Sequence, residues 1–587
     1  MWRGISCRAL GPEPFPLIFR HGAVIFNGIK ACQSGRREGA MSKTKGQNYM
    51  HGAAILTVGV VIMKLLGFIY KIPLGNILGD EGYSMFLSAY NIYFIFFTLA
   101  TAGLPVALSR LVAEADANGR AKQEEKLFRV AWMMFFVLGT VFALIMFLYP
   151  EWLADKYLEN PDAALSIKAM SPAILLVCLV SAYRGYCQGN GNMLPTTVDE
   201  VLEVLFKVIS GLVLAKLILD AGLGKPMGSA GAILGVSIGS VISLLYMVVY
   251  KRRNYNTLSG SYTGGRAADD VPGDDERVDS AWTIVKNIIS IGVPIAFGAC
   301  IMALLNSIDS KLCMNRLQAA AGFSYYEAKV LYGVYGKAQT LFNLPAAFIT
   351  PLTIAIVPAI SGAIVRGDRA EAIKTSDDSM RISAAVSLPM GVGLAVLSFP
   401  IMKVLYTNSN AAGPGLLSIM GVASIFVCIV LMENAVLQAS GKEKLTMLTM
   451  ITGGLVKIII NWFLVAQRPV NIYGAPVGTL VSYAVMMLMN LVFIRGALRH
   501  KPDLAGIFAA PLVSSLLMGA SAWAVYGLCG KLLGTGDRLH MLVCMAAAIL
   551  TAVVVYAVAA INTRAVTADD MKLIPGGEKL ARLLHMS

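Results

Sequence analysis

Basic side chains inside apolar stretches are the groups with which this chain could do chemistry. Lys64 lies near the middle of one such stretch, and Lys71 follows seven residues later. Because seven residues are close to two helical turns, both ammonium groups would lie on one face of a helix. A charge at the centre of a bilayer costs from about 2.5 to more than 10 kcal/mol, so Lys64 is expected to face a cavity or a partner. Lys71 has the alternative of snorkelling to the end of its helix.

A second group of charges lies on one helical stripe. Glu200, Glu203 and Lys207 are separated by three and four residues, so Glu203 and Lys207 could form an ion pair within the helix. Such a pair would need no substrate. Arg184 and Lys337 add two bases in or beside apolar stretches. The interior bases outnumber the unpaired interior acids, which favours an anionic cargo, and long lysine side chains suit a phosphate or pyrophosphate.

The surroundings of Lys207 recur later in the chain. In both copies a glycine follows a glutamine by three residues and a lysine follows it by nineteen, and the shift is 250 residues (438 − 188 and 457 − 207). The two copies are Gln188, Gly191 and Lys207, and Gln438, Gly441 and Lys457. A recurrence across apolar segments is typical of a duplicated transporter.

Lys457 has no acid nearby in its own helix, although Asn461 lies one turn away. Its predicted partner is Asp309, at the end of one apolar stretch, or Glu433, inside another. We therefore group Glu200, Glu203, Asp309, Glu433, Lys457 and Asn461 as gating or charge-pairing residues.

Long apolar segments must position these side chains. The chain has 587 residues, of which 56% are hydrophobic and 14% charged, whereas soluble domains average about 25% charged residues. A bilayer core needs roughly 20 apolar residues per helix. The sequence predicts an all-α polytopic membrane protein with fourteen spans, at about 52–72, 85–109, 129–149, 166–187, 198–220, 228–250, 283–308, 330–356, 382–405, 413–438, 445–466, 473–495, 505–529 and 540–562.

The net charge of +14 is distributed as a membrane topology requires. With the N-terminus inside, the basic connections fall on one side, at 110–129, 251–286, 366–381, 495–501 and after 564. This positive-inside bias places both termini in the cytoplasm. The connection that carries Lys311, Arg316 and Lys329 is an exception, since it would lie outside. Topology accounts for most of the basicity, so no nucleic-acid partner is expected.

The repeat divides the chain into two halves. Spans one to six (residues 41–250) and seven to twelve (283–496) form two six-helix lobes, related by a pseudo-two-fold axis along the membrane normal. A cytoplasmic linker (251–282) joins the lobes. Spans thirteen and fourteen (497–565) have no counterpart, and a cytoplasmic tail (566–587) comes after them. Residues 1–40 are expected to be an upstream or disordered extension.

Several chemistries have no support in the sequence. The nine cysteines form no CxxC pair and lie mostly in apolar spans, so they are expected to be small buried hydrophobes. The five histidines show no metal-ligand spacing. No Gly-x-x-x-x-Gly-Lys-Ser/Thr loop is present, so no nucleotide is expected. We predict neither a cofactor nor a metal, and a protein that is not an enzyme.

Three sequence blocks resemble a known family. The segment Arg184-Gly-Tyr-Cys-Gln-Gly-Asn-Gly-Asn-Met-Leu-Pro195 is similar to the hairpin between spans four and five of polysaccharide exporters in the multidrug/oligosaccharidyl-lipid/polysaccharide (MOP) flippase superfamily. Lys64-Leu-Leu-Gly-Phe-Ile-Tyr-Lys71, Gly79-Asp-Glu-Gly82 and Asp309 resemble its stage V sporulation protein B branch, which is related to the MurJ lipid II flippases.

The resemblance implies a V-shaped, two-lobed fold that works by alternating access. In MurJ-like proteins, bases on spans one, two and eight line the cavity, and Lys64 matches the span-one position. This chain departs from the pattern at span two, where it reads Phe96-Phe97-Thr98. Some relatives bind sodium through spans seven, eleven and twelve. An ammonium at Lys457 would take the place of that cation, so no sodium requirement is expected.

These observations predict a flippase for an undecaprenyl-pyrophosphate-linked cell-wall precursor, lipid II-like. Lys64 and Lys337 would be the leading cargo contacts, with Lys71, Lys207 and Arg184 as further bases. The expected partners are that lipid-linked anionic glycan and membrane lipids, with a cell-wall synthesis complex as a candidate, and we expect a monomer in the bacterial cytoplasmic membrane. Alternatives are a flippase for another lipid-linked polysaccharide or teichoic precursor, a cationic drug antiporter or a membrane glycosyltransferase.

Overall fold

Helices make up the regular structure of the protein wherever the structure describes it. The computed structural model describes residues 44–253, 278–407, 409–534 and 536–563. No strand occurs in these ranges, so the predicted all-α class is confirmed. The helices from Gly52 onward belong to one compact unit. The predicted extension 1–40, most of the linker and the tail 566–587 lie outside the described residues.

The helix bounds follow the apolar segments. The first half contains α2 (Thr44–Thr101), α3 (Leu104–Ala117), α4 (Ala121–Leu148), α5 (Pro150–Trp152), α6 (Ala164–Gly189), α7 (Leu194–Asp220) and α8 (Lys225–Arg253). The second contains α10 (Ala281–Ala319), α11 (Tyr325–Phe342), α12 (Leu344–Val365), α13 (Arg369–Val396), α14 (Ser398–Leu405), α15 (Gly413–Ala439), α16 (Glu443–Leu464) and α17 (Gly474–Leu498). The last two are α18 (Leu504–Leu533) and α19 (Arg538–Asn562).

Twelve segments within the described ranges are long and apolar enough to cross a membrane. One of them, Gly59–Ala117, includes the kink at Gly79, where φ is 67° and two helices meet. A glycine adopts this left-handed conformation without the steric cost that a side chain would bring. The charged helix α7 is not among the twelve. The protein is a multi-pass membrane protein, and the count of fourteen spans stays a prediction.

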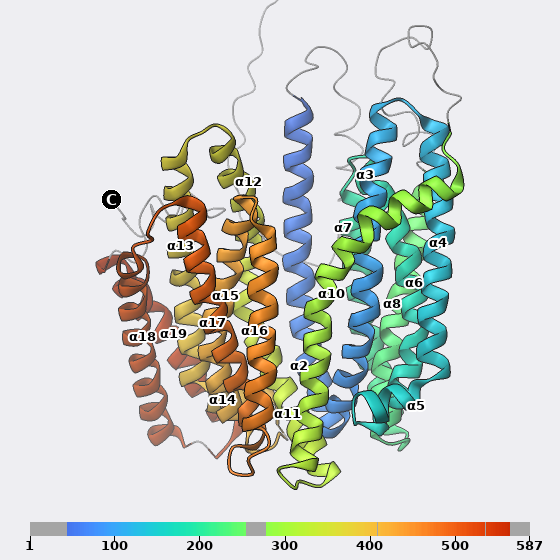
Figure 1. The fold of residues 1–587 in the computed structure, drawn as a ribbon. Coiled ribbons are helices and arrows are strands. Elements are labelled where there is room, and N and C mark those ends of the chain that lie inside the picture. Colours follow the sequence, from blue (N-terminus) through green and yellow to red (C-terminus); the bar gives the residue numbers. More distant parts are fainter. Residues whose placement is uncertain (1–43, 254–277, 408, 535, 564–587) are drawn as a thin grey trace, which may run out of the picture. The chain divides into compact units, whose positions relative to one another are not determined.

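The helices pack in two groups that follow the two halves of the chain. Helices α3, α4, α6, α7 and α8 pack against one another, and α11 to α17 form a second set of contacts. Helices α18 and α19 pack together, with α18 against α13 and α19 against α14. Helix α10 contacts both groups, since it lies against α3 and α4 and also against α11 and α16. Figure 1 shows α10 between the two groups. The pseudo-two-fold relation between the groups stays a prediction.

A close approach between two helices supports the charged helix α7. A side-chain carbon added at Gly235 of α8 would lie 2.5 Å from the backbone nitrogen of Gly211 on α7. Small residues let membrane helices approach closely and gain van der Waals contact. This contact fixes the face of α7 that meets α8, and thereby helps to set where its charged side chains lie.

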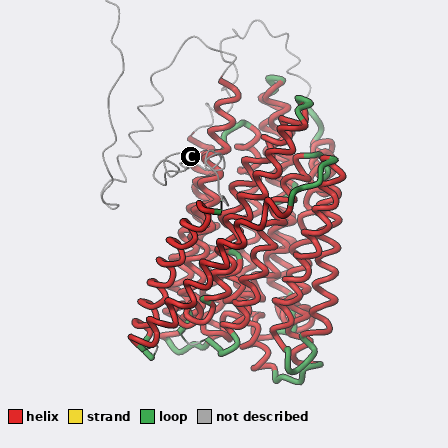
Figure 2. Tube along the Cα trace, turned by 90° about the vertical axis from the view of Figure 1, so that its left-hand side faces the viewer, coloured by secondary structure: helices red, strands yellow, loops and turns green. Residues whose placement is uncertain are grey.

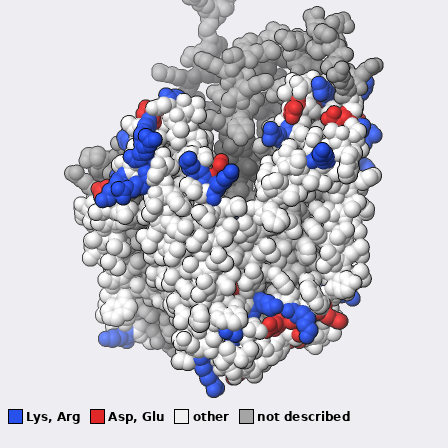
Figure 3. Space-filling view, viewed as in Figure 1, with Lys and Arg blue, Asp and Glu red and all other residues white. Residues whose placement is uncertain are grey.

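Connections and charged side chains gather at the two ends of the unit. Loops lie mainly at these ends in Figure 2, and Figure 3 shows Lys, Arg, Asp and Glu near both ends with a mostly uncharged band between them. We call the end that holds the kink at Gly79, α5 and the start of α11 the Gly79 end. The opposite end, which holds the connection between α3 and α4 at Gly119, is the Gly119 end.

Candidate functional site

Three lysines of the first half of the chain form the basic part of the site. Lys64 of α2 is exposed in the structure, and its ammonium group donates a hydrogen bond to Thr350 Oγ1 of α12 at 2.7 Å. Lys71, two turns further along α2, is half-buried and lies near Lys207 of α7, close enough for the two charges to repel each other. We call Lys64, Lys71 and Lys207 the lysine patch.

No carboxylate neutralises the lysine patch among the residues that the structure describes, since none of the ion pairs there involves Lys64, Lys71 or Lys207. The Glu203–Lys207 pair that the spacing allows is not formed. Lys64 links the first half of the chain to the second helix group, because Thr350 belongs to α12. The patch is therefore the part of the site with a surplus of positive charge.

Arg184 of α6 is surrounded by acids. Its guanidinium nitrogens lie 2.6 Å from Asp199, 2.8 Å from Glu203 and 3.7 Å from Glu200, all on α7. Ser240 of α8 donates a further hydrogen bond to Glu203 at 3.2 Å. Arg184 is buried, and these pairs hold α6 to α7. Three carboxylates already match the charge of Arg184 in this conformation, and a contact between Arg184 and cargo stays a prediction.

Lys337 of α11 is also neutralised. Its ammonium group lies 2.5 Å from Asp80 of α2, and only 1% of its side chain is exposed. Asp80 further accepts hydrogen bonds from Ser409 Oγ at 3.1 Å and from the backbone N–H of Asn410 at 2.8 Å. In this conformation Asp80 neutralises Lys337, and the role of Lys337 as a leading cargo contact stays a prediction. Lys337 joins the two helix groups.

A second ion-pair cluster joins the groups beside the first. Lys329 of α11, with a side chain 3% exposed, lies 2.8 Å from Glu81 of α2 and 2.6 Å from Asp162. Glu81 also pairs with Lys225 of α8 at 2.9 Å. We call the pairs Asp80–Lys337 and Glu81–Lys329–Asp162 the Gly79-end lock.

Neutral hydrogen bonds between the groups extend the lock. Tyr83 of α2 and Thr340 of α11 share one at 2.9 Å, and Asn91 donates to Tyr332 at 3.1 Å. Tyr325 donates to Asn160 Oδ1 at 2.8 Å. Buried hydrogen bonds are costly to leave unmade, so these contacts hold the two groups together at the Gly79 end.

A buried ion pair lies within the second half. Lys457 of α16 lies 2.8 Å from Asp309 of α10, and Asn461 donates to the other oxygen of the same carboxylate. Tyr335 donates to Asp309 at 3.4 Å. Of the two predicted partners of Lys457, the structure selects Asp309. Glu433 is fully buried in α15 and pairs with no base in the described part of the chain.

The sequence interpretation missed five of these charged residues. Asp80, Glu81, Asp162 and Lys329 belong to the lock, and Asp199 holds Arg184. A signal for the first two was present, because consecutive acids follow Gly79 between two apolar segments. Lys329 belongs to the one connection that breaks the charge bias. Asp199 precedes Glu200 and Glu203 on the stripe that already carried a candidate cluster.

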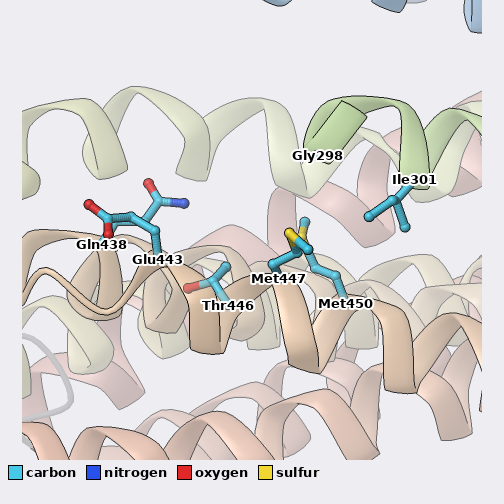
Figure 4. Close-up of a pocket in the computed structure, with 7 residues that line it drawn as sticks. All are labelled: Gly298, Ile301, Gln438, Glu443, Thr446, Met447 and Met450. Carbon is cyan, nitrogen blue, oxygen red and sulfur yellow. The ribbon is translucent and has the colours of Figure 1, made fainter. Parts of the chain in front are cut away.

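A small pocket lies between α10 and α16, with the end of α15 beside it (Figure 4). Its volume is about 160 Å³, and it is lined by Gly298, Ile301, Gln438, Glu443, Thr446, Met447 and Met450. None of these residues is a base, so this pocket is not the predicted anion site.

The fold defines a multi-pass membrane protein with charged side chains between its helix groups. A family model described as "Polysaccharide biosynthesis protein" matches residues 49–364, more than half of the chain. The chain belongs to this family.

Two curated proteins align in sequence with most of the chain. Lipid II flippase MurJ of Bacillus subtilis (strain 168) is 25% identical over 530 residues, which are 86% of this chain and 94% of that protein. Stage V sporulation protein B of the same organism is 24% identical over 545 residues, which are 90% and 98% of the two chains.

Solved structures show the same fold. A structure of lipid II flippase MurJ in an inward closed conformation matches with a TM-score of 0.63 at 13% identity, over 86% of this chain and 99% of that one. An inward-facing multidrug resistance transporter of the MATE family in the MOP superfamily matches with a TM-score of 0.57 at 15% identity, over 76% of this chain and 99% of that one. The predicted MOP-superfamily fold is confirmed.

Proposed function

We propose that this protein is an alternating-access flippase that moves an undecaprenyl-pyrophosphate-linked cell-wall precursor, lipid II-like, from the inner to the outer leaflet of the bacterial cytoplasmic membrane. The observation that carries the proposal is the lysine patch, which has no carboxylate partner among the described residues. The family membership supports a glycan-related cargo. The likeness over 86% of this chain to a protein named lipid II flippase MurJ supports lipid-linked cargo.

Charge decides which chemical group of the cargo binds the patch. Three ammonium groups that lie among apolar helices would be costly unless an anion neutralised them. A pyrophosphate offers several oxygens that accept charge-assisted hydrogen bonds, and lysine binds phosphate as a mobile point charge. Lys64 would be the leading contact, because its ammonium group is exposed and held by only one neutral hydroxyl group.

The lock would control access from one side. In this conformation two ion-pair clusters join α2 to α11 at the Gly79 end, and the lysines in both are buried. We assign the Gly79 end to the outer face and the Gly119 end to the cytoplasm, in accordance with the positive-inside bias. Cargo would bind the lysine patch from the cytoplasmic side. Breaking the lock would then open the outer side, and the prenyl chain would stay in lipid.

Contacts between α10 and the first helix group are made in the same conformation as the lock, and they would have to break for cargo to enter from the cytoplasm. Gly103, before α3, lies directly against the backbone of Gly292 on α10, and Gln123 of α4 donates to Asp279 at 2.9 Å. Both contacts involve α10 or the residues just before it, and α10 lies against both helix groups. Movement of α10 relative to α3 and α4 would therefore change access at the Gly119 end.

The membrane potential can drive this transport without a nucleotide. Moving one negative charge outward across an inside-negative membrane yields about 2.3 kcal/mol per 100 mV. A doubly charged pyrophosphate would gain roughly twice that if no counter-charge moved with it. A flippase for another lipid-linked polysaccharide or a teichoic precursor would use the same phosphate contacts, so the cargo must be tested with several headgroups.

The proposal is tested by depleting the protein from its own cells and labelling lipid-linked precursor in the outer leaflet. The expected result is a smaller outer pool and a larger inner pool, restored by the wild-type chain and not by Lys64→Glu. The matched control is Lys216→Glu, which reverses an exposed lysine on α7. An unchanged outer pool, or full rescue by Lys64→Glu, would remove a pyrophosphate cargo.

A further inference from the structure

A buried acid in the second half belongs neither to the lysine patch nor to the Gly79-end lock. Glu433 lies within α15, and 0% of its surface is exposed. Neither carboxyl oxygen has a partner in good hydrogen-bond geometry among the described residues, although the carboxamide of Asn490 lies close enough to interact with the carboxyl group. An ionised carboxylate that is removed from water without a partner costs several kcal/mol, whereas a neutral carboxyl group does not carry that cost. A carboxyl group in this position is therefore stable as the protonated acid.

The neighbouring amides fit a protonated carboxyl group. The carboxamide of Asn490 on α17 lies beside Glu433, and its nitrogen donates to Asn434 Oδ1 at 3.0 Å. That bond leaves Asn490 Oδ1 as a buried acceptor without a partner in the described structure. A neutral carboxyl group brings an O–H donor that an acceptor of this kind needs, and a carboxylate brings only further acceptors.

Charged groups on the surrounding helices do not neutralise Glu433. Helix α15 packs against α11, α12, α13, α14, α16 and α17. Helix α12 contains no charged residue, and α14 and α17 contain one base each, Lys403 and Arg495. The paired groups on the other helices are Lys329 with Glu81 and Asp162, Lys337 with Asp80, Lys457 with Asp309, Asp378 with Arg381, Asp377 with His500, and Glu371 with Arg366.

The position of Glu433 connects it to the transport path. Cys428, five residues earlier on α15, lies close enough to Lys64 for the two groups to interact electrostatically. Lys64 in turn donates to Thr350 of α12, which packs against α15. A movement of α12 or α15 on cargo release would therefore affect both the lysine patch and the surroundings of Glu433.

We propose that Glu433, with Asn434 and Asn490, is a proton-binding site that couples transport to the proton gradient. In the conformation described here the site holds its proton away from water. In another conformation α15 and its neighbours admit water, and the proton leaves. The proton is the ligand, and no bond other than the O–H bond of the carboxyl group forms or breaks. Its coupling to cargo rests on the proposed flippase function, whereas proton binding itself does not.

Spectroscopy tests the proton site without any assumption about cargo. Infrared difference spectra of the full-length protein in lipid, wild type minus Glu433→Gln, would isolate the carbonyl stretch of this carboxyl group. The expected result is a neutral-carboxyl band at neutral pH that is lost on alkaline titration and regained on return. A band that does not change over the whole stable pH range, or a carboxylate band at neutral pH, would overturn the proposal.

Transport tests the coupling. In proteoliposomes with the membrane potential clamped, a gradient of one pH unit is expected to shift the distribution of cargo between leaflets by up to about tenfold per proton. Reversing the gradient should reverse the shift. Glu433→Gln, which mimics the neutral acid, should abolish the shift, Glu433→Asp should retain part of it, and the exposed control Glu114→Gln should retain all of it.

The outcomes separate the two proposals. If Glu433→Gln responds to the gradient as the wild type does, Glu433 is a structural neutral acid and the coupling is wrong. If the wild type moves none of the tested lipids while the infrared band titrates reversibly, the proposed function fails and the proton site stands. If Glu433→Gln does not fold, Glu433→Asp decides, because a carboxyl band that titrates at a different pH in that variant is required.

Discussion

Asp80→Asn should open the Gly79 end. Asp80 accepts from Lys337, Ser409 and Asn410, and Lys337 is 1% exposed. The substitution keeps the size of the side chain and removes the only acid that pairs with Lys337 among the described residues. Breaking a buried ion pair by removing one partner costs about 3–5 kcal/mol, because the other charge stays buried without compensation.

That cost falls on the closed conformation alone. When the Gly79 end opens, Lys337 meets water and no longer needs a partner. Each 1.4 kcal/mol is about a tenfold change in an equilibrium constant, so about 3 kcal/mol shifts the closed-to-open ratio by roughly 150-fold. A protein that is closed at about 99:1 would then populate both conformations to similar extents.

The assay is a distance distribution between spin labels at exposed positions on the two helix groups. Leu223 lies between α7 and α8, Tyr326 lies on α11, and both are exposed. In a cysteine-free background, Asp80→Asn should move a large share of the population to longer distances. Glu371→Gln, which removes an exposed ion pair with Arg366, should change nothing, since such pairs contribute about 0–1 kcal/mol. An unchanged distribution in Asp80→Asn would refute the lock.

Three further predictions concern the remaining charges and the other end. Lys457→Gln should leave Asp309 buried without its base, which costs about 3 kcal/mol. It should lower the melting temperature in detergent by about 2–3 °C, because a chain of 587 residues has an unfolding entropy of about 1.2 kcal/mol/K. Transport in the wild type should be unchanged when choline replaces sodium. Arg184→Gln should destabilise the protein by a similar amount in thermal unfolding, because three carboxylates lose their base. A variant of normal stability that has lost cargo binding would instead show that Arg184 is a cargo contact. Gly103→Leu should prevent the approach of α3 to the backbone at Gly292. An engineered cysteine at the Gly119 end should then react faster with a water-soluble maleimide than it does in the parent protein. An equal rate would count against closure of the Gly119 end.

The membrane fold could be predicted because it depends on local properties of the chain. Lengths of apolar sequence set the helices, and a bilayer leaves no other way to satisfy the backbone of an unpaired segment. Boundaries were less accurate where helices bend. The first predicted span ends at residue 72, but α2 continues to its kink at Gly79, and the eighth (330–356) is divided between α11 and α12 near Asn343.

Partners of the charges were harder to predict, because they depend on contacts between distant segments. Asp80 and Lys337 are 257 positions apart in sequence, and neither has a local pattern that identifies the other. The repeat helped with Lys457, since it directed attention to a base without a local acid and reduced the choice to Asp309 or Glu433. For Glu203 the local choice was wrong. Lys207 lies one turn away on the same helix, but Arg184 of α6 takes the carboxylate.

These pairings also explain why a surplus of bases could be predicted while its location could not. Lys337 and Arg184 counted as free bases in the sequence, and each is matched by acids in the structure. Lys64, Lys71 and Lys207 keep their excess charge, because no described carboxylate forms an ion pair with them and the nearby Glu200 and Glu203 pair with Arg184 instead.

The most direct test of the central claim is transport by the purified protein. Proteoliposomes would contain a fluorescent undecaprenyl-pyrophosphate glycolipid in both leaflets, and a membrane-impermeant quencher would report its movement between them. We predict protein-dependent movement that a membrane potential accelerates and that Lys64→Glu abolishes, while a neutral glycolipid with the same prenyl chain does not move. Equal movement of the neutral and the pyrophosphate lipid, or none of either in protein that is folded by thermal unfolding, would contradict a flippase built on the lysine patch.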